Sequence, residues 1–486
     1  MTETLLRPLP APGEALFDST PVLGVTGPVA PLVYDAAPRT LRLRAVTFAA
    51  KRLADMVHVS GFTPEEAARR LRWRAIAAPG GLAARPVATE CQGELDAAVD
   101  AEHVTITHDS AHRLVAVTWT DPAFGAPVTG RAVAPAGYGG IVLGDAAGLA
   151  FTPAPIPRAA AVAYWTEDAT EQAPSVLRHA AETFLAGAPG AYGILIAAPG
   201  RVLFERYAHG GAPDRVTPSW SMTKSITATV IGRMIQLGWL RSVHDAAPAP
   251  LWTDPRDAHA EITLDHLLRM RSGLGVAVLH GDGSSTIGFE NSAVYQDGTD
   301  AFLAAQRNIV AMRPGRVFRY INAGPNVLGA IIRHEIEKRG LPYPATLYEL
   351  LVDKIGMSSY RHSADIAGNM IASGAGFATL RDYAKLGLLY VQDGVWNGER
   401  LLPEGWADYA LAPSHAGTNY AASFWTNSHA QFPDLPPDVA WASGASDQRT
   451  VIFRRHGLVA VITNETDHAM DLGRLNTFLA TALAVF

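Results

Sequence analysis

Apolar residues in the second half of the chain recur with regular periods. Residues 193–198 and 201–207 are two apolar runs separated by a Pro-Gly turn, which is typical of a β-hairpin. A second hairpin is predicted over 450–464, turning at Arg455-His456-Gly457. In residues 221–238 apolar side chains recur every three to four positions, and this period predicts a strong helix. Two further helices are predicted over 174–187 and 472–486.

The first 165 residues have a weaker pattern. Residues 1–40 are rich in Pro, Ala and Gly and read as an extended arm. A Thr-x-x-Glu capping box opens residues 62–78 and predicts a short helix there. Residues 102–109 and 112–121 alternate between apolar and polar side chains, so we expect a hairpin that turns at Ser110-Ala111.

This order of elements predicts an α+β fold. Strands come first, helices follow, and strands with a helix end the chain, which suggests an antiparallel sheet flanked by helices. A mainly helical domain is expected as an insertion over about 240–440. We divide the chain into an N-terminal extension of mixed α/β structure, residues 1–165, and a main domain, residues 166–486.

Composition and charge exclude several classes of protein. Of 486 residues, 48% are hydrophobic and 18% are charged, as in a globular chain. The net charge of −6 provides no basic excess to hold a phosphate backbone, so we expect no nucleic-acid partner. The single cysteine, Cys91, excludes an internal disulfide and every Cys/His zinc motif. No apolar run reaches 18 residues, so we expect no membrane span.

The N-terminus favours a cytoplasmic location, because it lacks both a basic start and an uninterrupted apolar stretch. A chain from which a signal peptide had been removed would look the same, so that alternative stays open. Assembly into a homo-oligomer is also left open.

The strongest chemical signal is Ser221-Met222-Thr223-Lys224, an S-x-x-K motif at the start of the predicted helix 221–238. Residues i and i+3 lie on one helix face, so the Ser221 hydroxyl and the Lys224 amine can meet. Serine needs a base to become a nucleophile, and a neutral lysine can be that base. The helix N-terminus favours developing negative charge. About 0.2 such motifs are expected by chance in this composition.

Two further elements fit the same chemistry. Tyr320-Ile321-Asn322 offers a phenol that can relay a proton and an amide that can bind lysine or a substrate carbonyl. The alternative is a helix-capping Asn322 beside a buried Tyr320. Before the second hairpin, the Ala445 N–H at a strand edge could form an oxyanion hole with the N–H of Ser221. The alternative there is an ordinary Gly/Ser loop.

In order and spacing, these motifs resemble those of the serine β-lactamase and penicillin-recognising family, which carries S-x-x-K, Y-x-N and K-T-G. The likeness is closest to the class C β-lactamase-related branch of esterases and 6-aminohexanoate-dimer hydrolases. It covers roughly residues 175–486, and is strongest in 219–227, 264–275 and 374–406. Faint likeness extends over about 50–145, and residues 1–45 match nothing known.

The resemblance implies a role for each matched residue. Ser221 would be the acylated nucleophile, Lys224 its base and Tyr320 the proton donor to the leaving group. The N–H groups of Ser221 and Ala445 would form the oxyanion hole. Substrate-binding residues implied by the family pattern are Asn322, Ser443, Gly444 and Trp425.

The sequence departs from the β-lactamases at Ala442, which stands where K-T-G has a lysine. A cation there helps to hold a substrate carboxylate, so its absence argues against turnover of β-lactams. Arg449 is a candidate replacement if its side chain points the same way. Trp425 could line an acyl pocket or simply pack in the core.

Other polar clusters carry less weight. His334-Glu335 begins like a zinc-binding H-E-x-x-H motif but lacks the second histidine. Strand alternation and a turn scatter a second group, which comprises His103, His108, Asp109 and His112. His266 reads as a structural histidine. We expect no metal and no cofactor.

The preferred function from sequence is therefore a serine hydrolase of the S-x-x-K type, an esterase or amidase. It would act through a Ser221 acyl-enzyme on small-molecule carboxylic esters or on linear amides of the nylon-oligomer kind. Two alternatives remain: an acyltransferase using the same acyl-enzyme, and a non-catalytic, penicillin-binding-like sensor module on the same fold.

Overall fold

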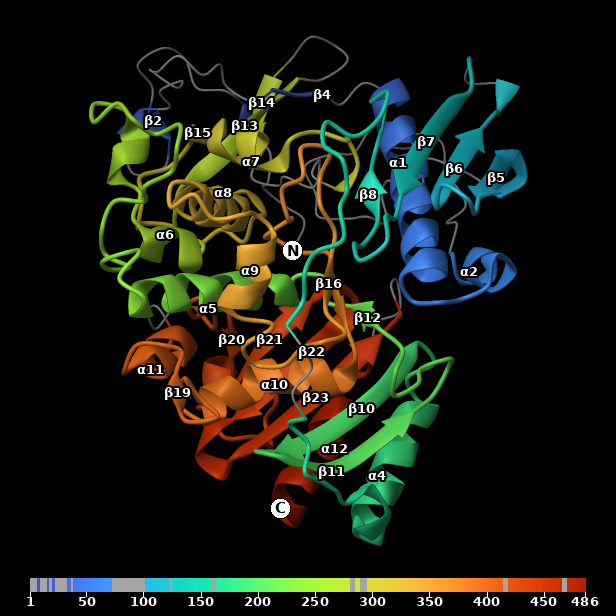
Figure 1. Ribbon diagram of the computed structural model, residues 1–486, viewed down its shortest axis with the longest axis vertical. Coiled ribbons are helices and arrows are strands. Elements are labelled where there is room, and N and C mark those ends of the chain that lie inside the picture. Colours follow the sequence, from blue (N-terminus) through green and yellow to red (C-terminus); the bar gives the residue numbers. More distant parts are fainter. Residues whose placement is uncertain are drawn as a thin grey trace. The chain divides into compact units, whose positions relative to one another are not determined.

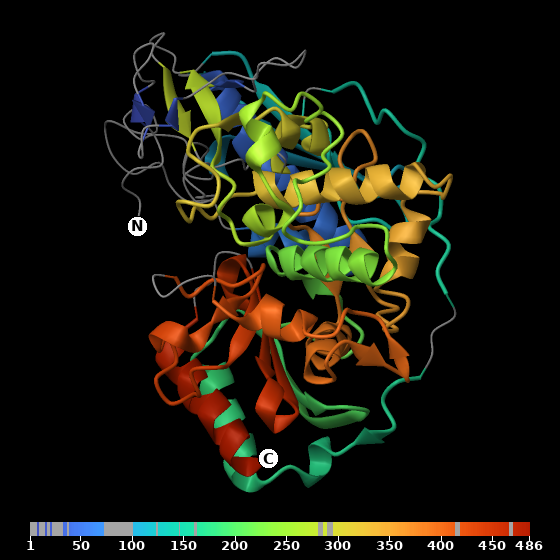
Figure 2. The ribbon, with the colours of Figure 1, turned by 90° about the vertical axis from the view of Figure 1, so that its left-hand side faces the viewer.

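The structure, a computed structural model, describes the chain outside a set of short segments and one longer one. These are residues 1–6, 9–14, 17–19, 22–32, 36–37, 72–100, 123–124, 145, 160–162, 280–284, 289–294, 414–417 and 466–469. Cys91, most of the predicted arm 1–40 and the end of the predicted helix 62–78 lie outside the described residues. Figures 1 and 2 show the ribbon in two views.

The chain forms two compact units, and each is built from three separate segments. The first unit comprises Met1–Pro155, Val243–His334 and His362–Ile371. The second comprises Ile156–Ser242, Glu335–Arg361 and Ala372–Phe486. The sequence suggested a single boundary near residue 165 and an insertion over 240–440. In the structure, residues 240–440 are instead shared between both units and contain strands as well as helices.

A seven-stranded sheet forms the centre of the second unit (Figure 1). Its strand order is β20-β21-β22-β23-β10-β11-β9, and only β9 pairs in parallel. Both predicted hairpins are present in it, as β10–β11 and β22–β23. The strands are Trp425–Thr426, Ala440–Gly444, Gln448–Phe453, Leu458–Asn464, Ala191–Ala198, Arg201–Tyr207 and Glu167–Asp168.

Helices cover both faces of this sheet. On one face α4 (Ser175–Ala186) packs with α12 (Leu472–Val485) over the apolar core, where Phe184 and Phe478 stack at 5.7 Å. On the other face lies α10 (Leu380–Val391), which packs on β10, β22 and β23. Figure 2 shows the sheet between these helical layers. The predicted α+β fold class is therefore confirmed.

The helix that carries the S-x-x-K motif is α5, Met222–Gln236, and nearly all of its residues are buried. Just before it, β12 (Thr217–Pro218) pairs with β17 (Gly376–Ala378). This pairing fixes where the chain enters α5. The unit also contains α9 (Ala345–Leu350), α11 (Trp406–Leu411), β18 (Val395–Trp396) and β19 (Glu399–Arg400).

In the first unit, a long helix packs on an antiparallel sheet. This helix, α1 (Pro38–His58), lies mainly against β7 and β6 of the sheet in which the predicted hairpin β5–β6 is extended by β7 and β8, and α2 (Pro64–Arg70) follows with Thr63 as its N-cap. The hairpin turn extends to Arg113, one of the left-handed residues, so it is longer than predicted. These strands are Val104–Asp109, Leu114–Trp119, Val128–Val133 and Ile141–Val142.

The second sheet of this unit joins distant parts of the chain. Strand β4 (Val33–Asp35) pairs in parallel with β13 (Leu274–Leu279). On either side of β13 lie β14 (Ser285–Gly288) and β15 (Ile309–Val310), and β1 (Arg7–Pro8) pairs with β14. The N-terminal residues thus belong to the same unit as residues 274–310. The helices nearby are α6 (Leu264–Leu268), α7 (Ala301–Gln306) and α8 (Ala323–Glu337), which begins in this unit.

A buried ion pair fixes α1 to its surroundings. The Lys51 ammonium donates to Asp55 Oδ2 at 2.6 Å and to Ser363 Oγ at 3.3 Å. The other oxygen of Asp55 accepts the Gly140 N–H at 2.6 Å. Because Lys51 is only 2% exposed, both charges depend on each other for compensation.

Within the residues described, no helix has the length and apolar character needed to cross a membrane.

Candidate active site

Ser221 stands at the N-cap of α5. The hydroxyl oxygen of an N-cap serine usually accepts a hydrogen bond from a backbone N–H of the first helical turn. The Ser221 side chain makes no such capping hydrogen bond. Its oxygen instead accepts from the Nζ of Lys224, 2.8 Å away and one helical turn further on. The sequence prediction that these two side chains meet is confirmed.

Lys224 is held from two directions. Its Nζ donates to Ser221 Oγ and, at 2.7 Å, to the carbonyl oxygen of Ser373. The side chain is 1% exposed. The hydrogen bond to a fixed carbonyl holds the amine beside Ser221, at a distance suited to proton transfer. Ser373 was missed from the sequence, because a backbone carbonyl has no residue signature.

The turn that presents Ser221 is strained. Trp220 has φ +44°, in the left-handed region, and is 7% exposed. For a residue other than glycine this conformation costs about 1–3 kcal/mol, so the surroundings must enforce it. The preceding Ser219 N–H donates to Gly376 O at 2.7 Å, which ties the turn to β17.

The end of β21 lies directly against this turn. A Cβ on Gly444 would stand 2.1 Å from the Ser219 carbonyl oxygen, so only glycine fits there. Ser443 is the residue before it in the strand, and Ala445 begins the short helix after it, exposed to solvent. The close approach supports an oxyanion hole built from the N–H groups of Ser221 and Ala445, which stays a prediction.

The turn after Ala445 is fixed by side chains that the sequence did not reveal. Ser446 and Asp447 both have left-handed backbones, with φ +57° and +62°. The Asn464 amide donates to Ser446 O at 3.0 Å, and the Met470 N–H donates to Asp447 Oδ2 at 2.9 Å. These contacts hold the backbone that carries the Ala445 N–H.

Arg449 does not replace the lysine that is missing at position 442. Arg449 pairs with Ser443 across the strands, and its guanidinium lies over the rings of Phe432 and Trp441 in the core. Ala442 pairs instead with Thr450, one residue further on and therefore on the opposite face of the sheet. Burial lowers the pKa of Arg449 from its usual value. The idea that Arg449 supplies the cation is therefore wrong.

The remaining predicted site residues fall in different places. Tyr320 and Asn322 lie in the first unit, just before α8, and the Asn322 carbonyl accepts the Asn326 N–H. Their roles in catalysis stay predictions. Trp425 lies in β20 of the second unit, packed against the core cluster and in edge contact with Tyr420. This placement favours core packing for Trp425, and its substrate contact also stays a prediction.

Two of the histidines singled out from the sequence have local structural partners. The Nδ1 of His266 accepts the Thr263 N–H at 3.2 Å while Thr263 Oγ1 accepts the His266 N–H, a reciprocal cap of α6. His112 pairs with Asp109 at 2.7 Å within the hairpin turn. Across the described part of the chain, no three His, Cys, Asp or Glu side chains are grouped so as to hold a metal ion.

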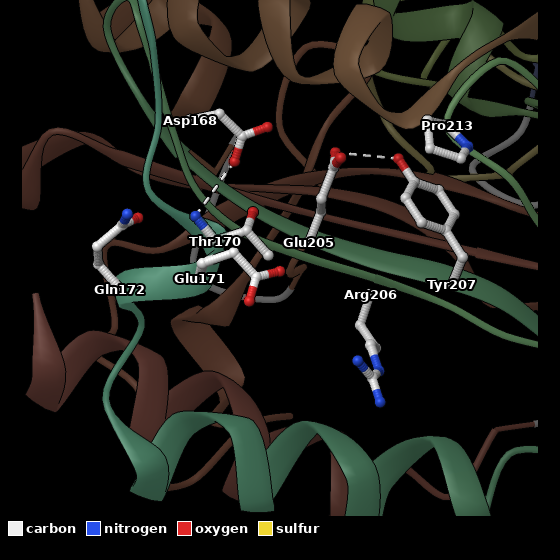
Figure 3. A pocket seen from close by; sticks show the side chains of 8 residues that line it. All are labelled: Asp168, Thr170, Glu171, Gln172, Glu205, Arg206, Tyr207 and Pro213. Carbon is white, nitrogen blue, oxygen red and sulfur yellow. Dashed lines mark hydrogen bonds between the residues drawn. The ribbon is translucent and has the colours of Figure 1, made fainter.

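A separate pocket of about 570 Å³ lies in the second unit, beside β11 (Figure 3). The Glu205 carboxylate accepts from the Tyr207 hydroxyl at 3.0 Å and forms an ion pair with Arg381. Arg381 also pairs with Asp168. These acidic groups are thus compensated within the protein, and we assign the pocket no chemistry. Its lining is Asp168, Thr170, Glu171, Gln172, Glu205, Arg206, Tyr207 and Pro213.

With the Ser221–Lys224 pair at the start of α5 beside an antiparallel sheet, the chain belongs to the beta-lactamase family, whose sequence model matches residues 177–484. The resemblance seen in the sequence is confirmed at the level of this family.

Solved structures share the fold at low identity. A protein from Bacillus anthracis, described provisionally as a 6-aminohexanoate-dimer hydrolase, is 18% identical with a TM-score of 0.50, over 62% of this chain and 81% of its own. A penicillin-binding protein homologue from Caulobacter crescentus is 17% identical with a TM-score of 0.50, over 65% and 98%. No curated protein sequence matches the chain significantly.

Proposed function

We propose that this chain is a serine hydrolase that acts through a Ser221 acyl-enzyme on carboxylic esters or linear amides. The observation that carries the proposal is the 2.8 Å contact between Lys224 Nζ and Ser221 Oγ, made by a serine that does no capping. Members of the family are generally serine hydrolases.

Acylation follows from this contact. The neutral amine of Lys224 takes the Ser221 hydroxyl proton while Oγ bonds to the carbonyl carbon of the substrate. The carbonyl electron pair moves to oxygen, and the resulting charge lies where the N–H groups of Ser221 and Ala445 are proposed to donate. The intermediate then collapses, the bond to the leaving alcohol or amine breaks, and the proton passes to that leaving group.

Deacylation uses the same groups in reverse. Water gives a proton to the lysine amine as its oxygen attacks the acyl carbon, and collapse releases the acid and restores Ser221. Tyr320 is proposed to relay the proton to the leaving group, and Asn322, Ser443 and Gly444 to bind substrate.

The substrate class is proposed from position 442. Ala442 is fully buried and provides no cation, and the Arg449 guanidinium is buried over core aromatic rings and paired with Asp447. A substrate carboxylate therefore loses a charge-assisted hydrogen bond, about 1.5–3 kcal/mol. Esters and linear amides without a carboxylate at that place lose nothing. Because one fold neighbour is described as a 6-aminohexanoate-dimer hydrolase, that linear amide is a suitable test substrate.

The test is kcat/KM in one buffer for p-nitrophenyl acetate, a linear 6-aminohexanoate dimer and nitrocefin, with mass spectrometry of the trapped acyl-enzyme. We expect turnover of the ester, weaker turnover of the amide and negligible turnover of nitrocefin. Nitrocefin as the best substrate would contradict the assignment.

The same experiment separates the two alternatives. An acyltransferase would turn over faster when an alcohol or amine acceptor is added. A sensor module would form the adduct once and show no further release of product.

A further inference from the structure

A row of buried hydroxyls begins in the turn before α5 and continues along the helix. Ser219, Thr223 and Thr227 follow one another at intervals of four residues, and each is at most 5% exposed. In the helix, side chains at i and i+4 lie on one face, so Thr223 and Thr227 point the same way, and Thr227 is also one turn beyond Lys224. We call Ser219, Thr223 and Thr227 the hydroxyl row.

The hydroxyl row binds one short backbone segment, Ala372–Gly376. Thr227 Oγ1 donates to Ala372 O at 2.8 Å. At the other end, the Gly376 N–H donates to Ser219 Oγ at 3.0 Å and to Thr223 Oγ1 at 3.2 Å. Between these two anchors, the carbonyl of Ser373 accepts from Lys224. The segment therefore runs antiparallel to α5 as a continuation of the β12–β17 pairing.

The segment does not relax into this path by itself. Ala375 has φ +66°, in the left-handed region that disfavours a residue with a Cβ. At Gly376 there is no room for a side chain, because a Cβ would meet Tyr360 Oη at 2.7 Å and both Ser219 Oγ and Thr223 Oγ1 at 3.0 Å. A strained, tightly fitted backbone persists where its surroundings over-determine it.

We propose that the hydroxyl row is a positioning device for the catalytic base: by anchoring Ala372 and Gly376, it holds the Ser373 carbonyl where Lys224 needs an acceptor. Thr227 acts on Lys224 through the adjacent Ala372–Ser373 backbone and touches no substrate. This inference rests on the proposed function, since it assigns Lys224 as the base.

The test substitutes Thr227 by Val, which keeps the shape but removes the hydroxyl, and by Ser, which keeps the hydroxyl. The matched control is Thr229→Val in the same helix. The Thr229 hydroxyl is also buried but bonds to Ser225 O and to the Tyr390 hydroxyl, away from the segment 372–376. Turnover of p-nitrophenyl acetate, the rate of labelling by a fluorophosphonate and the melting temperature are measured for each protein.

A misplacement of about 1 Å in a catalytic group can cost about 10²-fold in rate. We expect Thr227→Val to lower kcat by about 10- to 100-fold with little change in KM, and Thr227→Ser to restore most of it. Thr229→Val should lose comparable melting temperature yet keep its kcat. Thr227→Ala, which cannot overpack the site, should behave like Thr227→Val and covers the case in which the valine variant does not fold.

Equal kcat in Thr227→Val, Thr227→Ala and wild type would overturn the inference, as would an equal loss of kcat in Thr229→Val. The proposed function fails in a different way: wild-type protein that neither turns over the ester nor takes the fluorophosphonate label refutes the Ser221 acyl-enzyme itself.

Discussion

Arg449 and Asp447 form an ion pair across a single intervening residue, with 2.8 Å between the guanidinium Nη2 and Oδ1. The arginine is buried over two core aromatic rings, and the aspartate belongs to the left-handed turn that follows Ala445. The pair therefore stabilises the turn that carries the proposed oxyanion-hole N–H, and the positive charge of Arg449 is compensated within the protein.

Substitution of Arg449 by Met should lower stability without changing substrate preference. Asp447 loses its cationic partner, and a hydrogen bond to a charged group is worth about 1.5–3 kcal/mol of unfolding free energy. Denaturant titration measures that loss, and kcat/KM for p-nitrophenyl acetate and the linear 6-aminohexanoate dimer measures preference. We expect both rates to change by the same factor. A selective loss of turnover of the dimer, which ends in a carboxylate, would show that Arg449 contacts the substrate.

Removal of the nucleophile should abolish hydrolysis while the fold persists. Ser221→Ala deletes an oxygen that caps no backbone group, so its melting temperature should stay close to that of wild type. Turnover should fall at least about 10³-fold, because the covalent path is closed. In wild type, a fluorophosphonate should add its mass to the peptide that contains Ser221. Retained turnover in the alanine variant would exclude the acyl-enzyme.

Lys224 should be needed as a base and not merely as a charge. Lys224→Arg keeps a positive charge, but a guanidinium stays protonated and cannot accept the Ser221 proton. We expect a loss of about 10²–10⁴-fold in kcat, the usual contribution of a general base. Lys385→Arg is the control, since Lys385 is also buried but donates to Asp382 and Gly356 O. Activity of the Lys224 variant near that of wild type would leave another base to be found.

The buried ion pair in α1 should contribute more to the free energy of unfolding than an exposed ion pair does. Lys51→Met leaves the Asp55 carboxylate without its cation, and breaking a buried pair costs about 3–5 kcal/mol. Lys354→Met is the matched control because Lys354 and Glu399 are an exposed pair, worth about 0–1 kcal/mol. Chemical denaturation of both variants compares the two losses. Equal small losses would show that water compensates Asp55.

The cap of α6 should make the first unit sensitive to mild acid. Burial, with repulsion from Arg271, lowers the pKa of His266 below its usual 6.5. The unfolded chain therefore binds the proton more readily than the folded one, so unfolding free energy is greatest above pH 6.5 and falls as pH drops through that value. His266→Gln keeps a side-chain acceptor for the Thr263 N–H and does not titrate. Melting temperatures between pH 8 and 5 should fall less in this variant than in wild type.

The sequence predicts what depends on local spacing. Ser221 and Lys224 meet because they are one helical turn apart, and both hairpins of the large sheet follow from short turns. The side on which Arg449 lies was not predictable, because β22 is buried on both faces and its sequence has no alternation. The Ser373 carbonyl was missed because it comes from a backbone segment 149 residues beyond Lys224.

The division into units was hidden for a related reason. Pairing of β4 with β13 joins residues that are far apart in the chain, and the local sequence pattern of a strand does not predict which distant strand it pairs with. Tyr320 and Asn322 were recognised from their motif alone. The motif did not indicate which unit contains them, and the structure places both in the first unit.

The pairing of β4 with β13 also sets an order of events during synthesis. Val33 must wait until Ala277 has emerged from the ribosome, roughly 240 residues later. At the usual rate of elongation, that wait lasts about 10–50 s. The residues of β4 are thus made long before their partner, and during that interval the unpaired edge of β4 is open to other chains or to chaperones. Slowing translation ahead of residue 277 should therefore lower the yield of folded protein, whereas the same pause after residue 371, once the whole first unit has been made, should not.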